Sequence, residues 1–247
     1  LDIRNRIKLV NGPCGGFQAG ISFNIDDPDK LSRVIFEGQF SRNCNSYTMS
    51  RTVLEHDTYV YGLFENLWRE LGGSLTGGVR KAVIGAEQAR VLTWSSPPLA
   101  DIIRSINKNS NNVMTRQLVY TLAAEKVGVP GTREAGIAVI REFLQNRGID
   151  ITSLVLVNGA GLSRDERISA RTLASVLRAA EQSPYSSEYV SSLSLGGLDG
   201  TTVGRFGGDD NARTHVKTGR LDHVSALAGY VHGAGGKTFA EIGRAHV

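Results

Sequence analysis

The chain has 247 residues, of which 40% are hydrophobic and 21% are charged, an ordinary composition for a folded protein of one or two domains. Its formal net charge is only +4 and its basic residues are scattered, which argues against a nucleic-acid-binding surface. No apolar run approaches the roughly 20 residues that a bilayer crossing requires. These features exclude a disordered chain and give no support to a nucleic-acid-binding or membrane-spanning protein.

The first residues, Leu1–Arg4, contain neither a basic leader nor an apolar signal core, and the chain does not begin with Met. We therefore interpret residue 1 as an internal position of a longer protein. On this interpretation, the lack of a signal peptide says nothing about export.

The two cysteines, Cys14 and Cys44, both lie in the first fifth of the chain. A disulfide between them and two unrelated buried thiols fit the sequence equally well, and export would favour the disulfide. We expect no metal site, because no Cys-x-x-Cys motif occurs and no histidine pair has His-x-x-x-His spacing. The five histidines are His56, His215, His223, His232 and His246.

The first part of the chain is predicted to be β-rich. Short apolar runs at Ile7–Val10 and Val34–Gly38 are bounded by Gly, Pro and Asp, which is typical of strands. A helix is predicted over Thr58–Leu71, where apolar residues recur at helical spacing and are expected to be buried: Val60, Leu63, Phe64, Leu67 and Trp68. A further strand-like stretch follows within Ser74–Leu92.

A domain boundary is predicted near Ser95–Pro98, and helices dominate after it. They are predicted over Leu99–Asn107, Val113–Val127 and Arg133–Arg147, the last capped by Thr132, and after the capping residue Ser169. Leu154–Val157 has the length and β-branching of a buried strand, and Leu195–Thr202 is interpreted as a flexible connector. Two antiparallel strands are predicted within Thr214–Val231, with a turn near Leu221–Asp222.

Two polar motifs stand out in this second part. Ser110-Asn111-Asn112 opens an amphipathic run, at a place where Ser and Asn also serve as ordinary helix caps. Lys217-Thr218-Gly219 lies in the predicted hairpin. Ser-x-x-Lys, Ser-Asp-Asn and Lys-Thr-Gly together mark class A β-lactamases and penicillin-binding proteins, and two of these three occur here in that order, with Asn111 in place of Asp.

Further segments carry a likeness to one family: Pro98–Ile103, Ile106–Asn112, Asn158–Arg164, Gly197–Thr201 and Lys217–Leu221. Asn11–Cys14 and Leu71–Gly73 extend it to nearly the whole chain. In this order and spacing they resemble the penicillin-binding D-alanyl-D-alanine carboxypeptidase/endopeptidase family of the class C, low-molecular-mass type, peptidase family S13. The resemblance implies an α+β fold of the β-lactamase/transpeptidase-like type, an antiparallel sheet with helices packed on it. Residues 1–95 would be the remainder of an inserted β-rich accessory region, and residues 96–240 the C-terminal part of the penicillin-binding domain.

The resemblance also assigns catalytic roles. The Ser110 hydroxyl would relay a proton toward the leaving D-alanine nitrogen, and the Asn112 amide would hold the substrate's peptide carbonyl. Lys217 would supply a positive charge near the substrate's terminal carboxylate, and Thr218 would hydrogen-bond that carboxylate.

Gly219 would leave room for the substrate along the strand, and the backbone N–H of Arg220 would be one donor to the oxyanion. Two positions depart from the family pattern, since relatives often have Ser at the position of Ala160 and a small residue at that of Arg220. Both departures are expected to alter substrate fit.

The nucleophile of this family is the serine of a Ser-x-x-Lys motif well upstream of Ser-x-Asn. Ser105-Ile106-Asn107-Lys108 has the right letters, but it ends two residues before Ser110, whereas the nucleophile and the relay serine must approach the scissile bond from separate elements. We therefore predict that the nucleophile and its lysine precede residue 1, and that this chain alone is inactive.

The leading hypothesis is a periplasmic serine D,D-peptidase that acts through an acyl-enzyme on peptidoglycan stem peptides ending in D-Ala-D-Ala and that binds β-lactams. It requires no cofactor, metal or nucleic acid. One alternative is a β-lactamase-like hydrolase, against which the lack of a recognisable Glu-bearing deacylation loop counts. Another is a non-catalytic peptidoglycan-binding module.

The end of the chain, Glu241–Val247, reads like the translated start of a common sequencing adapter. We interpret residues 241–247 as a non-native tail, although a further strand is due at this place. No functional role is therefore assigned to His246.

Overall fold

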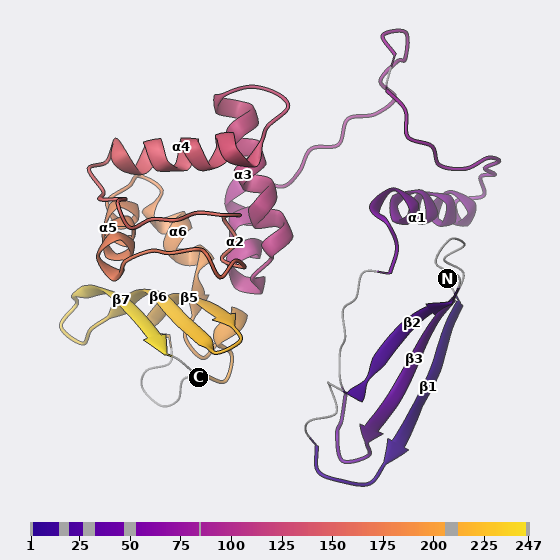
Figure 1. The fold of residues 1–247 in the computed structure, drawn as a ribbon, viewed down its shortest axis with the longest axis horizontal. Coiled ribbons are helices and arrows are strands. Elements are labelled where there is room, and N and C mark those ends of the chain that lie inside the picture. The colour runs from indigo at the N-terminus through magenta and orange to yellow at the C-terminus, as the bar shows by residue number, and fades with distance from the viewer. Residues whose placement is uncertain are drawn as a thin grey trace. The chain divides into compact units, whose positions relative to one another are not determined.

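The computed structural model describes residues 2–14, 20–26, 33–46, 53–83, 85–205 and 212–245, with the side chains of residues 244 and 245 left aside. His246 lies outside these ranges. The chain forms two compact units, Leu1–Val91 and Leu92–Val247, which divide close to the boundary expected at residue 95. Each unit contains its own sheet (Figure 1).

The first unit contains a sheet of three strands in the order β1-β3-β2. The central strand β3 (Arg33–Ser41) runs parallel to β1 (Asp2–Val10) and antiparallel to β2 (Ser22–Asp26). The two strands predicted in this region are parts of β1 and β3. The shorter strand β2 was not predicted.

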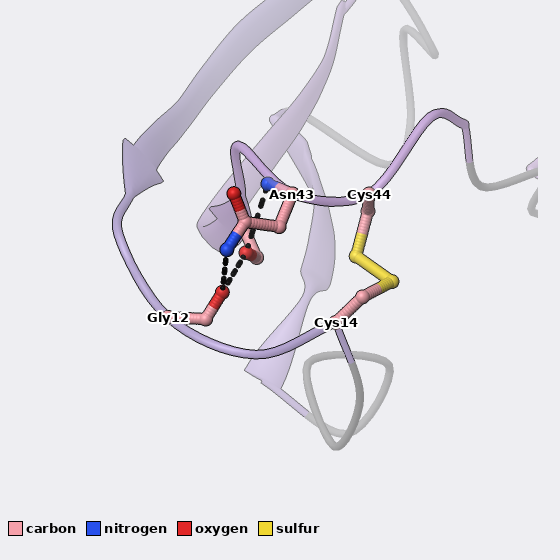
Figure 2. The surroundings of a disulfide bond; sticks show 5 residues. Gly12, Cys14, Asn43 and Cys44 are labelled. Atoms are coloured by element: carbon pink, nitrogen blue, oxygen red, sulfur yellow. Dashed lines mark hydrogen bonds between the residues drawn. A yellow bond between two sulfur atoms is a disulfide. The ribbon is translucent and has the colours of Figure 1, made fainter.

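A disulfide joins Cys14 to Cys44 just beyond the ends of β1 and β3, with Cα atoms 5.2 Å apart (Figure 2). The turn beside it is held by the carbonyl of Gly12, which accepts hydrogen bonds from Ser41 Oγ at 2.6 Å and from Asn43 Nδ2 at 2.8 Å. The disulfide and these hydrogen bonds together tie the ends of the two paired strands to each other.

Helix α1 (His56–Glu70) forms where it was predicted, but its apolar residues are not buried. The five residues expected in the core are between 43% and 52% exposed: Val60, Leu63, Phe64, Leu67 and Trp68. Helical periodicity shows which residues share a face, but it does not show that another part of the chain covers that face. The expected burial is therefore wrong for this structure.

The second unit places helices against an antiparallel sheet (Figure 1). Its helices are α2 (Leu99–Asn109), α3 (Asn112–Lys126), α4 (Arg133–Gln145), α5 (Ala170–Glu181) and α6 (Ser186–Ser192), with a short 3-10 turn, η2 (Gly200–Thr202). The predicted caps are present: Thr132 Oγ1 accepts from Ala135 N, and Ser169 Oγ accepts from Thr172 N. The four predicted helices are confirmed to within a few residues at their ends.

The sheet order is β4-β5-β6-β7, with β4 (Ser194–Leu195), β5 (Thr214–Leu221), β6 (Val224–His232) and β7 (Thr238–Ala245). The predicted hairpin is β5–β6, and residues 241–245 of the expected tail lie in β7. Tyr230 of β6 is 2% exposed and packs with Leu177 of α5 and with Leu193, and its hydroxyl donates to Leu177 O at 2.5 Å. Burial raises the pKa of Tyr230 well above its usual value.

Two predicted strands are not strands. The described part of Ser74–Leu92 contains none, because a strand requires a partner ladder and this stretch has none there. Leu154–Val157 contributes only one isolated bridge, between Val155 and Arg167. The backbone N–H of Val157 bonds to a side chain and not to a neighbouring strand, because Glu166 Oε1 accepts from it at 3.2 Å.

Candidate active site

The site begins at the corner between α2 and α3. Ser110 follows the last residue of α2 and has left-handed backbone angles, φ 54° and ψ 45°, and Asn111 N donates to Ile106 O at 3.1 Å across the corner. A serine with positive φ is uncommon, and such strained positions cluster at functional sites. The corner turns the Ser110 side chain out of the regular helix surface.

The two asparagines after Ser110 have different surroundings. Asn111 is the N-cap of α3, and its Oδ1 accepts from Met114 N at 3.0 Å. Asn112, half-buried in the first turn, makes no side-chain hydrogen bond to any other residue that the structure describes. The carboxamide of Asn111 is thus occupied by the helix, whereas that of Asn112 is free to bind a ligand.

Lys217 on β5 reaches the corner from a segment far away in sequence. Its Nζ donates to Ser110 Oγ at 2.6 Å and to Thr218 O at 2.8 Å. Burial lowers the pKa of Lys217 from its ordinary value, because the ammonium loses hydration that two neutral acceptors replace only in part. The structure therefore brings together a hydroxyl and an amine that the sequence separates by 107 residues.

One edge of β5 is open beside this pair. The carbonyl of Thr214 accepts from Gly196 N on the β4 side, and alternate residues of a strand direct their backbone groups to the same side. Thr218 and Arg220 therefore present their backbone groups to that side. Because β4 pairs only with His215 and Val216, no strand among the described residues covers the edge farther along.

Thr218, expected to bind a carboxylate, already has a partner within the chain. Its Oγ1 lies 2.6 Å from Thr201 Oγ1 in η2. Gly219 and Arg220 are both exposed on the same strand, and a β-carbon on Gly219 would lie no nearer than 3.9 Å to its neighbours. No neighbouring protein atom therefore crowds Gly219, which leaves space beside the strand at this position.

The segment Leu195–Thr202, predicted as a flexible connector, is instead closely bonded. Asp199 Oδ1 accepts from Leu195 N at 2.7 Å, and Thr202 Oγ1 donates to Leu195 O at 3.0 Å. The prediction failed because the glycines indicated freedom, while the order comes from the Asp and Thr side chains between them. Their pattern, Asp-Gly-Thr-Thr, was the available signal.

Ser105 and Lys108 do not form a nucleophile–base pair. Ser105 is exposed on α2, and Lys108 Nζ donates to Asp199 Oδ2 at 2.6 Å. The Lys108 amine is therefore bonded to the Asp199 carboxylate and not to the Ser105 hydroxyl. This geometry agrees with the rejection of Ser105 as a nucleophile.

A second loop borders α3. Glu166 Oε1 accepts three backbone hydrogen bonds, from Val157, Asn158 and Gly159, at 3.2, 2.9 and 3.2 Å. Gly159 has φ 71°, and a β-carbon there would collide with a methyl group of Val119 in α3. The carboxylate therefore shapes the loop, a role that no sequence motif indicated.

Residues 19–243 match the model of the D-Ala-D-Ala carboxypeptidase 3 (S13) family. The chain belongs to this family. Its fold agrees with that assignment, because the structure of penicillin binding protein 4 (dacB) from Haemophilus influenzae, complexed with a β-lactam, superimposes on it with a TM-score of 0.75. That match has 22% sequence identity and covers 100% of this chain and 57% of the other, and it confirms the α+β, transpeptidase-like fold.

Two S13 relatives are named as peptidases. D-alanyl-D-alanine carboxypeptidase of Actinomadura sp. (strain R39) is 31% identical over 249 residues, which cover 97% of this chain and 46% of that protein. D-alanyl-D-alanine carboxypeptidase DacB of Haemophilus influenzae is 27% identical over 214 residues, which cover 85% and 45%. The chain thus spans less than half the length of these curated relatives.

The described residues contain no group of three or more His, Cys, Asp or Glu side chains that could hold a metal ion. They also contain no helix long and apolar enough to cross a membrane.

Proposed function

We propose that this S13 chain is part of a serine-type D-alanyl-D-alanine carboxypeptidase/endopeptidase that cleaves peptidoglycan peptides through an acyl-enzyme. The observation that carries the proposal is the 2.6 Å hydrogen bond from Lys217 Nζ to Ser110 Oγ, beside the open edge of β5. A hydroxyl bonded to a half-buried amine can pass a proton, and an open strand edge can bind an extended peptide.

Each group has a separate task in this proposal. Lys217 directs its charge toward the terminal carboxylate of the substrate and polarises Ser110, which relays the proton to the leaving amine. The free carboxamide of Asn112 donates to the substrate's peptide carbonyl. The N–H of Arg220, on the open edge, donates to the oxyanion that forms in the transition state.

Thr218 acts together with Thr201 in this scheme. The two hydroxyls are 2.6 Å apart, so one of them donates to the other. If Thr218 donates to Thr201, its proton is not available to a substrate. Binding of a substrate carboxylate would require the reverse direction, in which Thr201 donates to Thr218 and Thr218 donates to the carboxylate. Such a chain of hydroxyls polarises the outer O–H and favours an anionic acceptor.

The environment of Glu166 favours a peptidase over a β-lactamase. A deacylating carboxylate must be free to activate water. One oxygen of Glu166 instead accepts three backbone hydrogen bonds, which hold the carboxylate in the loop. Glu166 is therefore not available as a deacylating base, and we expect a long-lived acyl-enzyme with penicillin. The non-catalytic alternative gains no support from the Ser110–Lys217 contact, which simple peptide binding does not require.

The proposed partners are peptidoglycan stem peptides ending in D-Ala-D-Ala and β-lactams that resemble them. Peptidoglycan lies outside the cytoplasmic membrane, so the protein would act outside the cytoplasm. In a Gram-negative cell this compartment would be the periplasm. For the endopeptidase activity, the corresponding substrates are cross-linked peptides, in which the cleaved amide joins D-amino acids.

Labelled penicillin tests the proposal. The full-length gene product is expected to form a covalent adduct and to release D-alanine from a D-Ala-D-Ala peptide, whereas residues 1–247 alone should form no adduct. Loss of the nucleophile removes nearly all the catalysis that its partners support, because they act as a unit. Peptide mapping by mass spectrometry decides the residue: an adduct on Ser105 or Ser110 would contradict the assignment, and no adduct on the full-length protein would overturn the function.

A further inference from the structure

An ion pair outside the catalytic groups connects the two halves of the site. Lys108 Nζ, on the last turn of α2, donates to Asp199 Oδ2 at 2.6 Å. The Lys108 side chain is only 19% exposed, against 44% for Asp199. A mostly buried ammonium without its carboxylate would be costly, so the pair is more than an incidental surface contact.

The Asp199 carboxylate also organises its own segment. Its other oxygen, Oδ1, accepts from Leu195 N at 2.7 Å, where β4 ends. Burial acts to raise the pKa of Asp199, but the hydrogen bonds from Lys108 and from Leu195 N outweigh that effect, and the pKa lies below its usual value. Asp199 therefore remains ionised and holds a helix and a strand at once.

The same segment continues to β5. Thr201, two residues after Asp199, donates its N–H to Ser194 Oγ at 3.2 Å and places its hydroxyl 2.6 Å from that of Thr218. Gly200 between them packs closely, since a β-carbon there would collide with Ser194 Oγ and lie 3.1 Å from Lys108 O. Residues 199–201 thus fill the space between the end of α2 and the strand that carries Lys217.

We propose that Lys108 and Asp199 form a positioning pair that sets the distance between Ser110 and Lys217. Lys108 precedes Ser110 by two residues at the same helix end, and Asp199 is joined through Thr201 to the residue after Lys217. Motion of either element would therefore change the Ser110–Lys217 hydrogen bond. The pair touches no substrate, and its role in catalysis rests on the function proposed above.

Three variants of the full-length protein test this role: Lys108→Met, Asp199→Asn and the double variant. Asp199→Asn keeps an oxygen for Leu195 N but loses the charge, and Lys108→Met keeps the length of the side chain. Each single variant is expected to lower the rate constant of acylation by a β-lactam at least tenfold, with little change in initial affinity. The double variant should lose no more than the worse single one, because both remove one interaction.

Glu134→Gln is the matched control, because Arg133 and Glu134 also form a 2.6 Å ion pair in this unit but lie exposed on α4. It should acylate at the wild-type rate. Lys108→Arg keeps the charge and should recover most of the acylation rate that Lys108→Met loses. A purely structural role would instead lower thermal stability and leave the acylation rate of the folded fraction unchanged, which would overturn the inference.

A crystal structure of the Asp199→Asn variant separates the inference from the proposed function. Ser110 Oγ and Lys217 Nζ should lie beyond hydrogen-bonding distance in it, whether or not the protein is acylated. An unchanged distance would refute the positioning role. If the unsubstituted protein is not acylated at all, the proposed function fails, while this distance still decides the role of the pair.

Discussion

At the scale of single residues, the two asparagines of the Ser-Asn-Asn motif differ in their hydrogen bonding. Asn111 accepts from Met114 N as a helix cap, and Asn112 keeps its carboxamide unbonded among the described residues. Asp and Asn are about equally good N-caps. Replacement of the motif's usual Asp by Asn at position 111 therefore preserves the cap, and Asn112, which we propose to face the substrate, is unaltered.

The pKa of Lys217 leads to a prediction about pH. Burial lowers it below the ordinary 10.5, so the ammonium form, which would bind the substrate carboxylate, is lost at a lower pH than for a free lysine. The acylation rate constant of the full-length protein with a carboxylate-bearing β-lactam should therefore fall on the alkaline side below pH 10.5. Lys217→Arg should abolish that fall, because arginine stays charged. An alkaline limb that survives in Lys217→Arg would assign it to another group.

The lowered pKa of Lys217 also makes the free energy of unfolding depend on pH. Between the lowered pKa and 10.5 the unfolded chain binds more protons at Lys217 than the folded chain does, so this group makes stability rise with pH. Below the lowered pKa the half-buried Lys217 ammonium imposes its full desolvation penalty. The site is thus less stable than a neutral side chain would make it.

At the scale of elements, α3 and α4 approach closely at Gly136. It is buried, and a β-carbon there would collide with the carbonyl and a methyl group of Val119 in α3. Gly136→Ala is therefore expected to destabilise the second unit by about 1–3 kcal/mol through overpacking, measured by urea unfolding. Gly62→Ala is the control, because Gly62 in α1 faces open space and should gain up to about 1 kcal/mol from helix propensity. Stabilisation by Gly136→Ala would contradict the close packing.

Local signals predicted the elements whose stability is local. The caps Thr132 and Ser169 and the helical spacing located α4 and α5, and the hairpin β5–β6 followed from β-rich runs around a short turn. The order of Leu195–Thr202 escaped prediction because its glycines indicated freedom, whereas the Asp and Thr side chains between them bond back to Leu195. Lys108, 91 residues from Asp199 in sequence, adds a contact that no local pattern shows. The catalytic assignments came from family motifs, since neither periodicity nor composition reveals which distant polar groups meet.

At the scale of the whole molecule, the two units give a prediction about the disulfide. Cys14 and Cys44 are 30 residues apart in sequence. In the chain-entropy model, a disulfide that closes a loop of that size stabilises the folded state by roughly 3–4 kcal/mol. The Cys14→Ser/Cys44→Ser double variant should lose hydrogen-exchange protection in β1 and β3, with α4 and α5 unaffected. Reduction of the wild-type protein is the matching treatment. Equal loss of protection in both units would contradict a local effect of the disulfide.

The distance in sequence between Ser110 and Lys217, 107 residues, also bears on how the site is made. Helices α2 and α3 can form from local contacts, but closing a loop of this length costs entropy that only the finished β5–β6 hairpin repays. During synthesis the hydroxyl therefore exists without its amine until the hairpin has left the ribosome. Substitutions that slow docking of the hairpin should thus delay the first appearance of β-lactam binding in refolding experiments, although the helical signal recovers on time.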